Sequence, residues 1–134
     1  MNIESYQDLL QAAAAQAEPQ RLLFVFAKAE LPNGYTDSQK QQFEQGHGGA
    51  LEPVLCVDKL PEEISEFQQL VTESQTTGID WDIAFVSAIG GRGGFPPNSD
   101  EAVQPLKMMM QKIQGGMIAD FLTFDKNGEL VALY

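Results

Sequence analysis

The sequence predicts an α/β fold, a three-layer α/β/α sandwich around a mixed, mainly parallel sheet of about five strands. Three observations support this class. Short apolar segments alternate with amphipathic ones, one apolar segment is hydrophobic on both faces, and an Asn-Gly pair precedes the last apolar segment. That pair predicts a C-terminal antiparallel hairpin at one edge of the sheet. With 134 residues, the chain is expected to form a single α/β domain over residues 1–134.

The first helix is expected to begin at Ser5, whose hydroxyl can cap it with Asp8 as the partner in a capping box. Apolar residues at helical spacing follow, and Pro19 ends the helix because the residue before a proline avoids the helical conformation. The next segment, Leu22–Ala27, is short and apolar at every position, which predicts a central strand buried on both faces.

The middle of the chain is expected to add two helices and a second strand. A turn at Leu31–Gly34 leads into a short polar helix over about 36–45. The second strand covers roughly Leu51–Val57. Pro61 suits the first position of the next helix, which is expected to stop at Gly78.

The last part of the chain is expected to add a third strand, a helix and a hairpin of two strands. A third strand is expected over about Trp81–Ile89, and a helix over about Asp100–Gln114. Pro105 conflicts with a helix interior, so the regular part of that helix is expected to begin at Pro105. A fourth strand over Met117–Phe124 and its return over Glu129–Leu133 form the hairpin.

The composition excludes several classes of function. The chain has 19 acidic and 8 basic residues, a net charge of -11, and its basic residues are scattered singly. Binding to nucleic acid or to an anionic membrane is therefore not expected. One cysteine and one histidine exclude an intramolecular disulfide and the multi-histidine and Cys/His zinc sites. With no secretory signal and no apolar stretch long enough to span a bilayer, we expect a cytoplasmic protein that needs no cofactor or metal.

The best candidate for a binding site is the glycine-rich loop after the third expected strand. Gly90, Gly91, Gly93 and Gly94 leave backbone N–H groups uncovered, so that successive amides can cradle an anion. Arg92 could clamp that anion through two hydrogen bonds. The loop matches neither the Walker A motif nor the dinucleotide-binding pattern. A flexible connection that carries an exposed arginine is the alternative interpretation, and it stays open.

Other candidate residues are weaker. Ligands of open α/β sheets bind beyond the carboxyl ends of the strands, where Asp58, residues 30–35 and the glycine loop are expected to meet. Asp58 can bind a hydroxyl or a metal there, or it can simply act as a cap or pair with Lys59. His47 is expected at the opposite edge, as a turn residue between glycines. Cys56 lies in the second strand and is expected to be buried as a small hydrophobic residue.

A resemblance to a known group rests on four segments: residues 5–11 (SYQDLLQ), 19–26 (PQRLLFVF), 56–59 (CVDK) and 91–94 (GRGG). Over nearly its whole length, the chain resembles small acidic bacterial proteins often labelled ribonucleotide reductase subunit alpha. The resemblance implies a bacterial, cytoplasmic protein and supplies no catalytic residues. The activity in that label is excluded, because a reductase large subunit needs a far longer chain and a set of redox cysteines, whereas this chain has one cysteine.

The leading hypothesis is a non-enzymatic binding or protein-interaction module, because no paired acid and base, metal cluster or activated nucleophile is recognisable. The strong acidity would suit a basic protein partner. The alternative is a protein, which could be an enzyme, that binds a small anionic or phosphate-containing ligand through Gly90–Gly94, Arg92 and Asp58. A structural homodimer that uses a methionine-rich surface at Met108–Met110 is a third hypothesis, and the oligomeric state stays open.

Overall fold

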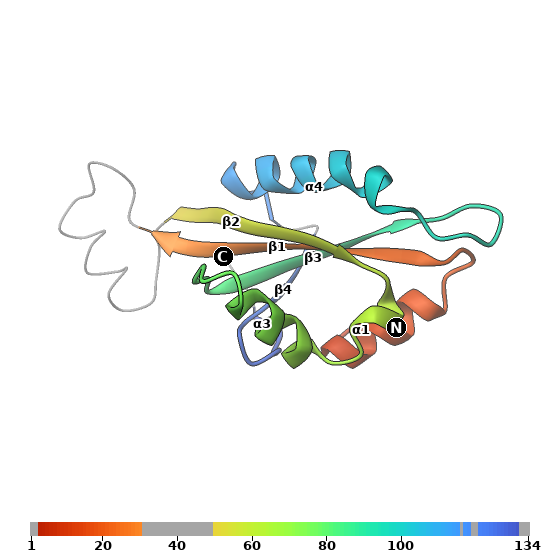
Figure 1. Cartoon of the computed structure of the whole chain (residues 1–134), viewed down its shortest axis with the longest axis horizontal. Coiled ribbons are helices and arrows are strands. Elements are labelled where there is room, and N and C mark those ends of the chain that lie inside the picture. The colour runs from red at the N-terminus through yellow and green to blue at the C-terminus, as the bar shows by residue number, and fades with distance from the viewer. Residues whose placement is uncertain (1–2, 31–49, 116, 119–120, 132–134) are drawn as a thin grey trace.

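The described part of the chain is built on a four-stranded sheet in which every neighbouring pair of strands is antiparallel (Figure 1). The computed structural model describes residues 3–30, 50–115, 117–118 and 121–131. In these residues the strands are β1 (Gln20–Glu30), β2 (Ala50–Lys59), β3 (Ile83–Gly90) and β4 (Leu122–Phe124). Their order across the sheet is β2-β1-β3-β4, which puts β1 and β3 in the interior.

The expected mainly parallel sheet of about five strands is therefore wrong. β2 and β3 run in the same direction and are connected through the helix α3 (Phe67–Gln75), but β1 lies between them and runs the opposite way. Alternating strands and helices indicate that the chain crosses the sheet repeatedly. This alternation does not determine which strands become neighbours. Here β1 lies between β2 and β3, and every pairing is antiparallel.

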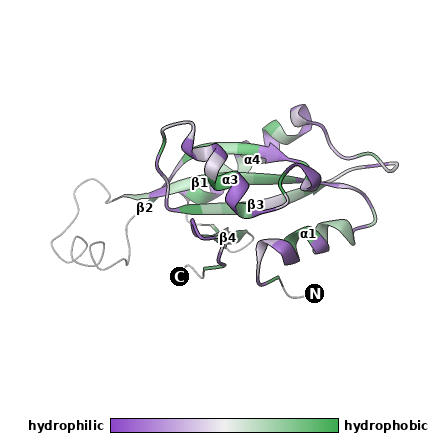
Figure 2. Cartoon of the chain, turned by 60° about the horizontal axis from the view of Figure 1, so that its bottom comes forward, coloured by the Kyte–Doolittle hydropathy of each residue, from purple (hydrophilic) through white to green (hydrophobic). Residues whose placement is uncertain are grey.

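Helices cover both faces of the sheet (Figure 1). The helix α4 (Ser99–Gln114) packs on one face, and α1 (Tyr6–Ala14) and α3 pack on the other. The side chains of β1 alternate between these layers and are buried at all six positions from Leu22 to Ala27. The structure thus confirms the central strand predicted over Leu22–Ala27, and Figure 2 shows the hydrophobic colouring of the sheet beneath the helices.

The face covered by α1 and α3 contains an aromatic cluster. Tyr6 lies at its centre, with ring centroids 6.5 Å from Phe24, 5.7 Å from Phe67 and 6.3 Å from Phe124. The hydroxyl of Tyr6 donates a hydrogen bond of 2.8 Å to the carbonyl of Ile64. Burial raises the pKa of Tyr6 far above its usual value, so this hydroxyl stays protonated and keeps its bond.

The helix starts that the sequence predicts at Ser5 and at Pro61 differ in outcome. Ser5 Oγ accepts a hydrogen bond of 3.2 Å from the N–H of Asp8, as predicted for the cap of α1. The carboxylate of Asp8 accepts from the N–H of Glu4, one residue before the cap. Pro61 begins only a short 3-10 helix, η1 (Pro61–Glu63), and α3 starts at Phe67, so the single helix predicted from Pro61 is divided in two.

Pro105 lies inside α4 without interrupting it. The helix is continuous from Ser99 to Gln114, so the prediction that its regular part begins at Pro105 is wrong. Asn98 caps the helix by accepting from the N–H of Glu101 at 2.8 Å. Proline lacks the N–H that would bond the carbonyl four residues earlier, that of Glu101. Glu101 is exposed, so water can bond this carbonyl and the proline is tolerated.

The C-terminal turn forms where the Asn-Gly pair predicts it. Gly128 adopts a φ of +79°, a conformation that side chains rarely allow, and Phe124 forms an antiparallel bridge with Leu130. The strand before the turn is shorter than expected, because β4 begins at Leu122 rather than at Met117.

Some expected features fall outside the described residues, namely the turn at Leu31–Gly34, the polar helix over about 36–45, and His47. Within the described segments, no helix combines the length and the apolar character that a membrane crossing requires.

Candidate functional site

The glycine-rich loop forms a tight turn at the end of β3. Arg92 and Phe95 exchange two backbone hydrogen bonds of 3.0 and 3.1 Å across Gly93 and Gly94. These two glycines have φ of +62° and +83°, the pair of positive angles that a two-residue turn of this kind requires. A side chain at Gly91 has no space, because a Cβ there would clash with the carbonyl oxygen of Phe95. The loop thus forms a hydrogen-bonded turn in the structure.

One backbone amide of this turn donates a hydrogen bond to a carboxylate of the chain itself. The N–H of Gly94 donates to Glu18 Oε2 at 2.8 Å, and the N–H of Gly91 donates to the carbonyl of Pro19 at 2.9 Å. Both acceptors belong to the segment just before β1. One amide of the turn thus binds an anionic oxygen that belongs to the chain itself, that of Glu18. Binding of an external anion by this loop stays a prediction.

Arg92 projects from the turn into solvent. Its side chain is 88% exposed, and its Nη2 lies 3.6 Å from Glu101 Oε2 in the first turn of α4. An ion pair this exposed contributes little to stability, because water screens the attraction and both long side chains lose freedom. Arg92 is therefore available for contacts with another molecule.

Asp58 belongs to a compact polar cluster at the end of β2. Its Oδ2 accepts hydrogen bonds from Arg21 Nε and from the Ser99 hydroxyl, each at 2.7 Å. The guanidinium of Arg21 also donates to Ser99 Oγ at 2.7 Å and to the carbonyl of Pro97 at 3.2 Å. The Arg21 and Asp58 side chains are only 11% and 20% exposed. This cluster fastens the start of β1, the end of β2 and the start of α4 to one another.

Two opposing effects act on the pKa of Asp58. Burial raises it, but the hydrogen bonds from Ser99 and Arg21, together with the charge of Arg21, outweigh burial and hold the pKa below its usual value. Asp58 is therefore ionised at neutral pH, with one carboxylate oxygen committed to internal partners.

The structure brings some of the predicted site residues together and separates others. Asp58 lies opposite Leu23 and Gly90 lies opposite Gln20, so both are found at the end of the sheet where β1 begins. The first turn of α4 connects them, because Ser99 contacts Asp58 and Glu101 contacts Arg92. The end of β1 lies at the opposite end of the sheet. Of the segment 30–35 that was expected to join this site, Glu30 therefore lies away from Asp58, and residues 31–35 lie outside the described residues.

Cys56 is exposed, so the expectation of a buried cysteine is also wrong. β2 is an edge strand in the described sheet, and its side chains are covered less completely than those of β1. The apolar neighbours of Cys56 along the chain gave the impression of a strand buried on both faces.

Sequence reasoning missed two residues that shape this end of the molecule. Arg21 directly precedes the buried residues Leu22–Ala27 of β1. A charged side chain next to such a buried segment indicates that another polar side chain of the protein binds it. Phe95 stands between Gly94 and Pro96, and 75% of its surface is exposed. An aromatic residue at the tip of a glycine turn, followed by proline, is the signal that would have found it.

Comparison with protein-family models, curated proteins and solved structures found no match to this chain. Among the residues that the structure describes, no three His, Cys, Asp or Glu side chains are grouped so that they could hold a metal ion.

Proposed function

We propose that this protein is a non-enzymatic protein-interaction module of the bacterial cytoplasm, and that it contacts its partner through the turn Arg92–Phe95. Its place in a bacterial cytoplasm is supported by the sequence resemblance and by the single cysteine. The turn lies in the loop between β3 and α4, which extends beyond the sheet in Figure 1.

The exposure of Phe95 is the main observation in support of the proposal. An aromatic side chain that is 75% exposed leaves a large apolar surface in water. Aromatic residues and arginine are enriched at the centres of protein interfaces, where they supply much of the binding energy. Arg92 stands beside Phe95 at the other end of the same two-residue turn.

The hydrogen bonds that hold the turn also favour binding. Two backbone bonds close it, and hydrogen bonds from Gly91 and Gly94 tie it to Pro19 and Glu18. A side chain held on an ordered turn loses less freedom when it binds than one on a mobile loop, which improves affinity.

The charges around the turn indicate the kind of partner. Glu18 and Glu101 lie beside it, and the whole chain carries a net charge of -11. A partner that accepts Phe95 in an apolar pocket, with basic side chains around the rim, would match both features. Association with such a partner should weaken as salt rises.

The internal bonds of Asp58 give it a structural role at this end of the sheet. Its Oδ2 is held by Arg21 and Ser99. The cluster supports the base of the turn.

A photocrosslinking experiment tests the proposal. The photoreactive residue p-benzoylphenylalanine replaces Phe95 in one version of the protein and Met117 in another. Met117 serves as the control because it is similarly exposed, at 63%, but lies beyond the other end of α4. After illumination in the bacterial cytoplasm, a discrete protein adduct at position 95 and none at position 117 is expected. Equal labelling at both positions, or none at position 95, would contradict the proposal.

The second candidate function is binding of a small anionic ligand by Gly90–Gly94, with Arg92 as the clamp and Asp58 nearby. The bond from Gly94 to the Glu18 carboxylate favours it, because the same amide would bind a ligand oxygen if Glu18 moved aside. A thermal-shift screen with nucleotides and phosphorylated metabolites tests it. The candidate predicts a stabilising compound whose effect Glu18→Gln increases and Arg92→Ala removes. If no compound stabilises either the unmodified protein or the Glu18→Gln variant, this candidate is wrong.

A further inference from the structure

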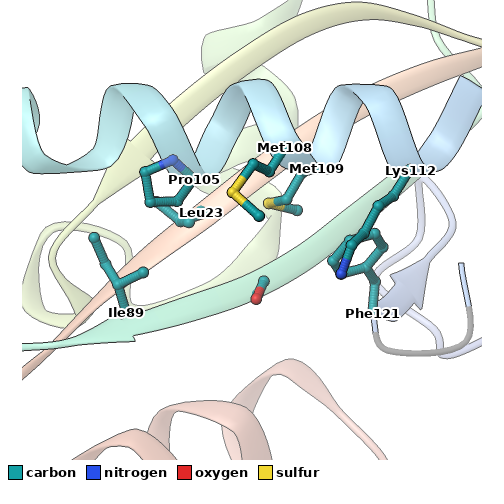
Figure 3. A pocket seen from close by; sticks show the side chains of 8 residues that line it. Leu23, Ile89, Pro105, Met108, Met109, Lys112 and Phe121 are labelled. Carbon is teal, nitrogen blue, oxygen red and sulfur yellow. The ribbon is translucent and has the colours of Figure 1, made fainter. Parts of the chain in front are cut away.

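A pocket of about 150 Å³ lies between α4 and the sheet, on the face opposite α1 and α3 (Figure 3). It is separate from the turn Arg92–Phe95. Strand residues form its floor, α4 forms its roof, and Phe121 lies beside its end. The lining residues are Leu23, Ser87, Ile89, Pro105, Met108, Met109, Lys112 and Phe121.

The polarity of the pocket changes along its length. Figure 3 shows Ile89 and Pro105 at one end, and Lys112 beside Phe121 at the other. Ser87 of β3 lies opposite Leu23 of β1 in the sheet that forms the floor, and it is half-buried. The pocket therefore combines an apolar end with an end that carries an ammonium group.

The size of the pocket limits what can enter it. The pocket is open to solvent, and its volume is comparable to that of an apolar cavity that holds one benzene-sized group, roughly 150 Å³. Two methionines of the roof can adapt to such a group. Met109 is 3% exposed and Met108 is 50% exposed, and both have flexible, polarisable thioether side chains. Met108 also leaves the pocket accessible, because half of its surface is in solvent.

We propose that this pocket binds a small monocarboxylate with a ring-sized apolar body. The body would contact Leu23, Ile89 and Met109, and the carboxylate would accept hydrogen bonds from Lys112 and Ser87. Charge complementarity favours an acid over a neutral compound, because the ammonium of Lys112 stands at one end of a mostly apolar space. Lys112 is already engaged within the chain, and its three N–H donors allow it to bond a carboxylate in addition. The site is independent of the proposed interaction turn.

Benzoate is the test ligand, and benzamide, with nearly the same shape but no charge, is its neutral control. The protein is labelled with ¹³C at the methionine methyl groups and titrated with each compound by NMR. With benzoate, the methyl signals of Met108 and Met109 are expected to shift until saturation, whereas that of Met117, outside the pocket, stays unchanged. Benzamide is expected to bind at least about tenfold more weakly, because it lacks the charge-assisted bond.

Three variants identify the site. Lys112→Met removes the ammonium and is expected to weaken benzoate binding at least about tenfold, whereas Lys107→Met, at an exposed lysine of the same helix, leaves it unchanged. Ser87→Leu fills the floor and is expected to abolish binding. The variant Lys112→Met also loses an internal contact, so Ser87→Leu provides a separate test. Absence of saturable shifts at Met108 and Met109, or equal affinity for benzoate and benzamide, would overturn the proposal.

Discussion

Arg21 Nε donates to Asp58 Oδ2 over 2.7 Å, and this bond connects the start of β1 with the end of β2. The Ser99 hydroxyl donates to the same carboxylate oxygen at the start of α4. The start of β1, the end of β2 and the start of α4 are thus joined at the end of the sheet from which the turn with Phe95 projects. The cluster holds the base from which the turn projects.

Replacing Arg21 with methionine should destabilise the protein by about 1–3 kcal/mol, because it leaves a largely buried carboxylate without its charged partner. Urea unfolding of the variant and the unmodified protein measures the change. Asp80→Asn is the control, since it breaks the exposed ion pair between Asp80 and Lys126. If the control lowers stability as much as Arg21→Met, then the burial of the Arg21–Asp58 pair has no special importance.

The lowered pKa of Asp58 predicts how stability changes with pH. The folded protein binds this proton less tightly than the unfolded chain, so a fall in pH favours unfolding. The stabilisation from Asp58 is complete above the ordinary carboxyl range near pH 4, and it is lost as pH falls through the lower folded pKa. The difference in unfolding free energy between the unmodified protein and Asp58→Asn should therefore be constant from about pH 7 to 5 and then narrow. A constant difference down to pH 2 would contradict the lowered pKa.

Two glycines of the turn should respond differently to alanine. Gly91→Ala should disrupt the turn, because the new Cβ clashes with the carbonyl oxygen of Phe95. At Gly93 the space is open and only the positive φ opposes a side chain, so Gly93→Ala should cost about 1–2 kcal/mol with the turn retained. Unfolding experiments give the stabilities, and amide chemical shifts of residues 91–95 report the turn. Equal effects of the two substitutions would show that the turn is looser than described.

Local features of the fold were predictable because nearby residues determine them. The cap at Ser5, the buried strand at Leu22–Ala27 and the turn at Gly128 each depend on side chains or backbone conformations within a few positions. Strand neighbours were not predictable in this way. The placement of β1 between β2 and β3 depends on packing over the whole sheet, and that placement changed a parallel prediction into an antiparallel sheet.

The site was predictable only in part, for a related reason. Four glycines among the five residues 90–94 identified the turn. The acceptor that Gly94 binds, Glu18, is 76 residues away in the chain. The partners of Asp58 are similarly distant, with Arg21 37 and Ser99 41 residues away. Such contacts appear only once strand order is known. The sequence also could not show that Cys56 would lie in an edge strand.

The affinity of the partner captured by crosslinking, measured by calorimetry with the unmodified protein and with Phe95→Ala, tests the central claim most directly. Most of the Phe95 ring is already in solvent, so the substitution should change the unfolding free energy by less than about 0.5 kcal/mol. Loss of a central aromatic contact should nevertheless weaken binding by about 2 kcal/mol or more, roughly thirtyfold. An unchanged affinity with an intact fold would contradict the assignment of this turn as the interaction surface.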